Sequence, residues 1–104
     1  MTVLTVFRSR LRPGIESAYQ TLAGEISQLA RVAPGFLEEK TFIADDGERL
    51  TFVLFSDSES HAAWRDNPRH REAQEIGKNE LYSEYQVYSA ETQYSSVFPH
   101  AVLS

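Results

Sequence analysis

The sequence predicts one α+β domain of the ferredoxin-like sandwich class, in which strands and helices follow the order βαββαβ. Three patterns indicate this fold: an apolar, β-branched segment at the start, a long helical stripe after it, and two further strand-like segments joined by a tight turn. Since each helix would connect two strands of the same sheet, we expect four antiparallel strands with the helices on one face. A chain of 104 residues is the size of a single domain with one modest core.

The first strand is predicted over residues 2–11, which are rich in Val, Leu, Thr and Phe and are followed by the break Pro13-Gly14. From Ile15 to Leu29, apolar residues recur three and four positions apart, as on a helix with one buried face. The pair Pro34-Gly35 should end this helix.

The second and third strands are predicted to form a hairpin. Residues 36–44 and 48–55 flank Asp45-Asp46-Gly47, a sequence that readily takes the positive backbone angles of a tight turn. The third strand would then present an apolar row on each side of the sheet. Thr51, Val53 and Phe55 form one row, and Leu50, Phe52 and Leu54 form the other.

A second helical region is predicted because Ser56 and Glu59 have the spacing of a capping box. Pro68 must interrupt this region, since it lacks a backbone donor and restricts the residue before it. We therefore expect one helix over about residues 57–66 and another that ends near Asn79.

The fourth strand is predicted over residues 81–90, with Tyr85 and Val87 on one face and Tyr82 and Tyr88 on the other. Both faces of the resulting sheet are apolar, whereas the helices can cover only one of them. An apolar face of that size is typical of an interface, so we expect a homodimer that packs sheet to sheet.

The chain is predicted to be a single domain, residues 1–104, with its core in residues 2–90. The tail, residues 91–104, is too apolar for a free end. We expect it to pack on the dimer partner through Tyr94, Val97, Phe98 and Val102.

Composition excludes several classes of function. A net charge of −5 argues against a nucleic-acid partner, because binding a phosphate backbone needs a basic surface. The chain has no cysteine, which excludes disulfides, thiolate metal sites and iron–sulfur clusters. No segment approaches the apolar length of a membrane span or of a secretion signal, so we expect a cytoplasmic protein without a membrane partner.

Known cofactor and catalytic motifs are also missing. His61, His70 and His100 have no metal-ligand spacing, so no metal is expected. Pro13-Gly14 stands alone after the first strand, where a nucleotide-binding loop would need several glycines. No serine has the flanking glycines of a nucleophile elbow. We therefore expect no cofactor.

One run of residues resembles a known family. Over residues 2–90 the chain is similar to the antibiotic biosynthesis monooxygenase domain family, and the resemblance rests mainly on the second half: Trp64, Asn67-Pro68, His70, Arg71, Ala73, Gln74, Gly77, Tyr82, Tyr85 and Val87, with Phe7 to Gly14 and Pro34-Gly35-Phe36 in the first half. The resemblance implies a dimeric α+β barrel with one pocket in each subunit, between helices and sheet. Family members include oxygenases of phenolic polyketides, quinol oxygenases, haem-degrading enzymes and isomerase-like proteins.

Departures from the family pattern narrow the choice. Haem-degrading relatives combine an asparagine on the first strand with a haem-ligating histidine ten residues after the tryptophan, whereas this chain has Phe7 and Arg8 on that strand and Gln74 at the later position. Haem degradation is therefore not expected. Polyketide-oxidising relatives can place an asparagine two residues before the tryptophan, where this chain has Ala62. Their mechanism therefore cannot be transferred whole to this chain.

His70 and Trp64 are the candidate catalytic residues. The ordinary pKa of histidine, about 6.5, suits proton removal at neutral pH. His70 shares a helix face with the small residues Ala73 and Gly77, so we expect it to point inward. Trp64 could stack on an aromatic substrate and offer its indole N–H. The alternative is that His70 is a hydrogen-bonded core residue and Trp64 a packing anchor.

Four further residues are candidates for substrate binding. Tyr85 and Tyr82 could hold a phenolate through their hydroxyl groups, although strand tyrosines more often serve sheet packing. His61 lies one turn before Trp64 but would more often be exposed in the first turn of a helix. Arg8 could meet an anionic substrate, or could simply be solvated at the surface.

The function expected from these residues is cofactor-independent oxygenation of a small phenol or quinol. Such a substrate can reduce dioxygen itself once deprotonated, so the protein must supply a base, a donor and a dry aromatic pocket. Two alternatives remain open: a dimeric module that binds a small aromatic or hydrophobic molecule without catalysis, and an isomerase-like acid/base enzyme.

Overall fold

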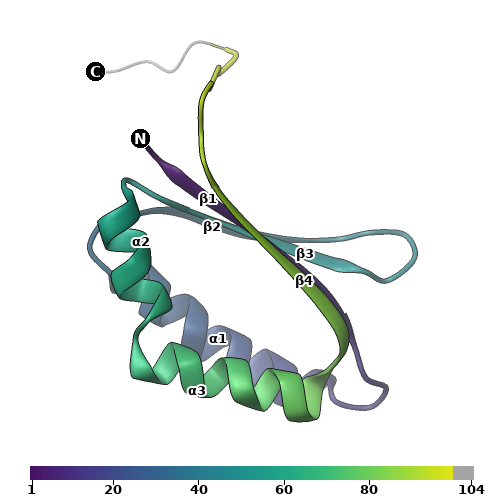
Figure 1. The fold of residues 1–104 in the computed structure, drawn as a ribbon. Helices are drawn as coiled ribbons and strands as arrows, with labels where there is room; N and C mark the ends of the chain where they lie inside the picture. Colours follow the sequence, from purple (N-terminus) through teal and green to yellow (C-terminus); the bar gives the residue numbers. More distant parts are fainter. Residues whose placement is uncertain (100–104) are drawn as a thin grey trace.

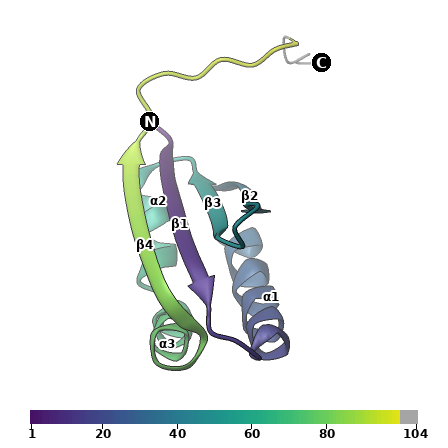
Figure 2. The same ribbon diagram turned by 90° about the vertical axis from the view of Figure 1, so that its right-hand side faces the viewer.

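The computed structural model describes residues 1–99 and contains a four-stranded antiparallel sheet with its helices on one face (Figures 1 and 2). The spatial strand order is β2-β3-β1-β4. The strands are β1 (Val3–Leu11), β2 (Phe36–Ile43), β3 (Arg49–Phe55) and β4 (Tyr82–Glu91). The helices are α1 (Glu16–Val32), α2 (Ser58–Arg65) and α3 (Pro68–Ile76), and α3 continues into the π-helical turn η1 (Gly77–Leu81). The predicted ferredoxin-like fold is confirmed.

The second helical region is divided into two helices, as predicted from Pro68. Pro68 occupies the first turn of α3, where its missing N–H costs nothing. The side chain of Asn67 caps this helix by accepting hydrogen bonds from the backbone N–H groups of Arg69 and His70.

Within residues 1–99, no helix has the length and apolar character needed to cross a membrane.

The cap of α2 differs from the prediction. Asp57, rather than a capping box built on Ser56, is the N-cap residue, and its carboxylate accepts the backbone N–H of Ser60 at 2.7 Å. Ser56 contributes indirectly, because its hydroxyl donates to Asp57 at 3.1 Å. These donors hold the pKa of Asp57 below its usual value.

The side of the sheet that faces the helices carries the core. Val53 and Phe55 of β3 are buried there together with Ala30 of α1 and Trp64 of α2. Burying side chains of this size stabilises a fold by roughly 1.5–3 kcal/mol each. This cluster holds α1 and α2 against one end of the sheet and so fixes where α2 begins.

The predicted face of Tyr82 is wrong. The pairing of β1 with β4 shifts register between Arg10 and Leu11. The shift brings Tyr82 to the helix-facing side, where its ring contacts Phe7 and Tyr85 at centroid distances of 5.3 Å and 5.9 Å. Strict alternation along β4 therefore fails at its first residue.

The other face of the sheet, here called the open face, has no helix over it (Figure 2). Strand pairing places apolar side chains from all four strands on it: Leu4, Val6, Phe42, Leu50, Phe52, Leu54, Tyr88 and Ala90. Phe42 is 49% exposed, and its ring stacks on that of Phe52 at 6.2 Å. The predicted second apolar face is therefore present.

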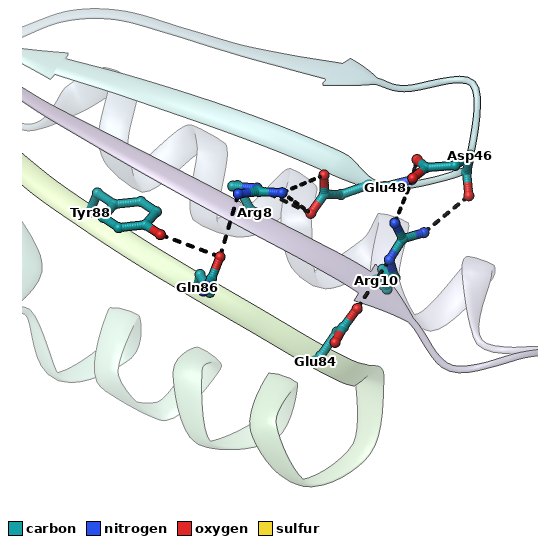
Figure 3. Close-up of polar contacts among 7 residues, drawn as sticks. All are labelled: Arg8, Arg10, Asp46, Glu48, Glu84, Gln86 and Tyr88. Carbon is teal, nitrogen blue, oxygen red and sulfur yellow. Dashed lines mark hydrogen bonds and ion pairs between the residues drawn. The ribbon is translucent and has the colours of Figure 1, made fainter.

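A polar network occupies one end of the open face (Figure 3). The guanidinium of Arg8 donates to both carboxylate oxygens of Glu48 at 3.1 Å. Arg10 pairs with Asp46 at 2.7 Å and with Glu84 at 3.1 Å. Because both arginines have carboxylate partners on this side, Arg8 points away from the helices.

Residues 92–99 continue beyond β4, and Tyr94, Val97 and Phe98 are strongly exposed. Their predicted contact with a dimer partner stays a prediction. Val102 and His100, which the sequence also singles out, lie outside the described residues.

Replacement of Gly35 by alanine should destabilise the fold by at least about 2 kcal/mol, because two costs add. Gly35 has φ +83°, and a left-handed conformation costs an L-residue roughly 1–2 kcal/mol. An added Cβ would also lie 2.5 Å from the Cβ of Ser60, and overpacking of this kind costs roughly 1–3 kcal/mol. Urea denaturation measures the loss.

The matched control is Gly24→Ala. Gly24 lies inside α1, and an added Cβ there meets nothing within 4 Å, so this change should stabilise the helix by roughly 0.5–1 kcal/mol. Equal unfolding free energies for the two variants would contradict the prediction.

Candidate functional site

Three of the predicted site residues converge where α2 meets α3. The ring of Trp64 lies 4.3 Å from that of His70 and 5.9 Å from that of His61, measured between centroids. All three side chains are buried. The expectation that His61 is more often exposed is therefore wrong, because His61 lies on the side of α2 that faces the sheet, whereas Ser58 and Glu59 of the same turn are exposed.

Hydrogen bonding fixes the protonation pattern of His70. Its Nδ1 lies 3.2 Å from the backbone carbonyl oxygen of Arg65 at the end of α2. A carbonyl can only accept a hydrogen bond, so Nδ1 carries the hydrogen and, in the neutral ring, Nε2 keeps its lone pair. Burial lowers the pKa of His70, against an opposing contribution from the Arg65 carbonyl. The imidazole is therefore neutral and basic at Nε2 near pH 7.

His61 is anchored to the sheet. Its Nε2 is hydrogen-bonded to Oγ1 of Thr5 at 2.7 Å, and Thr5 is in turn bonded to Oγ of Ser89 at 2.9 Å. Burial is the main cause of the lowered pKa of His61, with the positive charge of Arg65 next. The sheet thus holds His61 as a neutral ring against one side of Trp64.

The indole nitrogen of Trp64 has no hydrogen-bond partner. Trp64 is 8% exposed, and its Nε1 is the one buried side-chain nitrogen or oxygen within residues 1–99 that lacks a partner. A buried donor without an acceptor costs roughly 1–3 kcal/mol. Because this nitrogen is closed off from solvent, an acceptor on a ligand would reach it only if the packing around the ring opened.

A pocket of about 360 Å³ lies beside this cluster, with Trp64 and His70 in its wall. Its volume is near the lower end of the range of about 300–1,000 Å³ that is usual for small-molecule sites. The remaining lining residues come from the end of α1, from α2 and from the connection to α3: Leu29, Val32, Ala33, Pro34, Glu59, Ser60, Ala63 and Asn67.

This pocket lies among the helices, although the family resemblance implies one between helices and sheet. Phe55 accounts for the difference, because its ring packs 5.2 Å from that of Trp64 and fills the sheet side. The wall is mostly apolar, with Glu59 as its one carboxylate. Such a pocket suits a small aromatic molecule that carries few charges.

Tyr82 and Tyr85 form a separate cluster with Phe7 and Tyr19. Neither tyrosine lines the pocket beside His70. Burial raises the pKa of Tyr82 to about 12, whereas Tyr85 is 44% exposed. Their roles in binding, like that of Arg8 on the open face, stay predictions.

Sequence reasoning missed two residues that build this site. Asn67 enters the sequence-based prediction as the residue before a proline and as part of the family pattern, without a role of its own, yet it caps α3 and also lines the pocket. Thr5 lies 56 positions before its partner His61, so no local pattern could have linked them. Within residues 1–99, no group of three or more His, Asp or Glu side chains is placed to hold a metal ion.

The lowered pKa values of His61 and His70 predict that the fold weakens in mild acid. Between the ordinary pKa of about 6.5 and the lower folded-state value, the unfolded chain binds more protons than the folded one. The free energy of unfolding should be highest above about pH 6.5 and should fall as the pH drops through this window. Urea denaturation at a series of pH values measures the effect, and the fall should be smaller in His70→Gln. If the free energy of unfolding fell equally with pH in wild type and in His70→Gln, that result would contradict a buried neutral His70.

Comparison with known proteins identifies the family. The model of the family described as "Antibiotic biosynthesis monooxygenase" matches residues 2–76. No curated protein matches the sequence significantly.

Solved structures share the fold at low sequence identity. Rv0793 from Mycobacterium tuberculosis superposes with a TM-score of 0.81 at 17% identity, covering 93% of this chain and all of that one. SnoaB, a cofactor-independent oxygenase from Streptomyces nogalater, gives 0.78 at 11% identity, covering 90% and 95% of the two chains. A conserved protein from Methanosarcina mazei Go1 superposes with a TM-score of 0.79 at 9% identity, covering 89% of this chain and 94% of that one. These likenesses establish the fold, while the family model covers most of the chain. The protein therefore belongs to the antibiotic biosynthesis monooxygenase family.

Proposed function

We propose that the protein is a cofactor-independent monooxygenase of a small phenol or quinol. The observation that carries this proposal is the tautomer of His70: the hydrogen bond from Nδ1 to Arg65 leaves a basic Nε2 on a ring that lines an apolar pocket. Family membership and the fold shared with an oxygenase support it.

The reaction needs no oxidant other than dioxygen. Nε2 of His70 takes the hydroxyl proton, and the phenolate passes one electron to dioxygen. The phenoxyl radical and superoxide then combine to form a C–O bond at an ortho or para ring carbon that carries hydrogen, and the peroxide takes a proton from His70. Loss of that hydrogen as a proton breaks the O–O bond and expels hydroxide, and the two combine as water. Phenol and dioxygen thus become quinone and water.

The surroundings of His70 favour the first step. An apolar pocket excludes water, which keeps the neutral base available and strengthens any hydrogen bond inside. The indole N–H of Trp64 has no partner, and it could serve an oxyanion only if the packing around the ring opened. His61, held by Thr5, also packs against the Trp64 ring, at a centroid distance of 5.9 Å. We assign no role in the reaction to Tyr82, Tyr85 or Arg8, because they lie outside this pocket.

We further propose that the working form is a homodimer joined through the open face. The apolar row of that face includes Phe42, Phe52 and Tyr88, with no element of the described chain over it. Exposed apolar area of this extent favours burial against a second sheet. The positive charges of Arg8 and Arg10 are already paired with the carboxylates of Glu48 and Asp46. This end of the open face can therefore also approach a partner.

The proposed reaction predicts protein-dependent oxygen uptake by the purified, metal-free protein with a panel of quinols, anthrones and flavonols. His70→Gln should lower the rate at least about 100-fold, the usual minimum for loss of a general base. Trp64→Phe should retain the base and lose the donor, so a smaller loss is expected. An oxygen electrode measures both.

The same panel of compounds distinguishes oxygenation from a second function, binding without catalysis. If no compound causes oxygen uptake while one raises the melting temperature of wild type and His70→Gln equally, the oxygenase proposal is wrong and the pocket is a binding site.

The proposed dimer is tested by two neighbouring residues of β2 that point to opposite sides. Phe42, on the open face, is 49% exposed and Ile43, on the helix-facing side, is 61% exposed. Phe42→Asp should shift the protein to a monomer in sedimentation analysis, whereas Ile43→Asp should not. A wild-type monomer, or equal effects of the two changes, would contradict a dimer through this face.

A further inference from the structure

Arg49 is a half-buried arginine at the start of β3 that the proposed reaction does not use. It pairs with Ser9 of β1 and Ile43 of β2, and therefore lies on the helix-facing side of the sheet. Its guanidinium carbon lies 4.9 Å above the ring of Tyr19 in α1. This stacking covers one face of the guanidinium and leaves its N–H edge available.

Within residues 1–99, Arg49 is the one arginine whose guanidinium makes no hydrogen bond or ion pair. Arg12 donates to two backbone carbonyls. The other six each contact a carboxylate: Arg8, Arg10, Arg31, Arg65, Arg69 and Arg71. The guanidinium nitrogens of Arg49 keep access to solvent, because none of them is among the buried side-chain nitrogens that lack a partner. The N–H edge of Arg49 is therefore suited to an anion.

A pocket of about 500 Å³ opens beside this group, with Arg49, Leu11, Pro13 and Ser83 in its wall. Four charged side chains line it: Arg10, Glu16, Asp46 and Arg49. Asp46 is paired with Arg10 at 2.7 Å, and Arg10 is also paired with Glu84 at 3.1 Å. Glu16 is the carboxylate of this wall that makes no ion pair within residues 1–99. Tyr82 adds no charge, because its pKa is raised to about 12 and it stays protonated.

We propose that Arg49 is the anion-recognition residue of a second binding site, and that the ligand is an aromatic carboxylate. The guanidinium edge matches the two oxygens of a carboxylate, and Leu11 and Pro13 offer an apolar surface for a flat ring.

This site is distinct from the pocket beside His70. Val53 of β3 pairs with Thr5, the residue that holds His61, and Arg49 lies four strand positions away, or about 13 Å. A ligand of one or two rings cannot reach both. Binding at Arg49 therefore does not depend on whether the protein consumes dioxygen.

The test compares two probes of similar shape, 1-naphthoate and the neutral 1-naphthalenemethanol, by NMR of the arginine side-chain N–H signals. Wild type should bind 1-naphthoate with a Kd below about 1 mM, and the Arg49 Nε–H signal, assigned by its loss in Arg49→Gln, should shift. Arg49→Gln should weaken 1-naphthoate binding at least tenfold and leave 1-naphthalenemethanol unaffected.

Three variants complete the design. Glu16→Gln should tighten 1-naphthoate binding, since it removes the opposing charge. Arg71→Gln, the same charge change on the exposed side of α3, should leave it unchanged. Arg49→Lys keeps the positive charge but loses the guanidinium edge that can donate two hydrogen bonds to a carboxylate. It should therefore weaken 1-naphthoate binding less than Arg49→Gln does. If Arg49→Gln fails to fold, Arg49→Lys takes its place in the test.

No saturable binding of 1-naphthoate would overturn the inference. So would equal affinity in wild type and the Arg49 variants, or a shift confined to other arginines. Loss of oxygen uptake in His70→Gln with unchanged 1-naphthoate binding would support both sites as separate.

Discussion

The packing of Trp64 between the sheet and a histidine is the interaction on which the rest of this structure depends. The indole ring lies 5.2 Å from the ring of Phe55, a fully buried residue of β3, and 4.3 Å from the ring of His70, measured between centroids. This contact joins α2 and the start of α3 to the sheet, and the same contact forms one wall of the pocket. Stability and binding therefore share a residue, so changes at Trp64 affect both.

The two histidines beside Trp64 differ in which ring nitrogen is hydrogen-bonded. His61 is bonded through its Nε2 to Thr5 of β1, so that nitrogen is occupied. His70 is bonded through its Nδ1 to the carbonyl of Arg65, so its Nε2 is not. Burial favours the neutral form of both rings. Only His70 combines a neutral ring with a free basic nitrogen at the pocket.

Local patterns in the sequence were sufficient to predict the elements of the fold. The alternation of Leu50, Phe52 and Leu54 predicted the open face, and Pro68 predicted the division between α2 and α3, because both effects act over a few residues. Tyr82 was misplaced because its face depends on a register shift against β1. The burial of His61 and the lack of a partner for Arg49 depend on residues far away in the chain, which no local pattern records.

The most direct measurement of the central claim is the tautomer of His70, read from long-range ¹H–¹⁵N NMR spectra near neutral pH. The structure requires a neutral ring with hydrogen on Nδ1 and an unprotonated Nε2. A ring protonated at Nε2, or charged at both nitrogens, would contradict the assignment of His70 as the base.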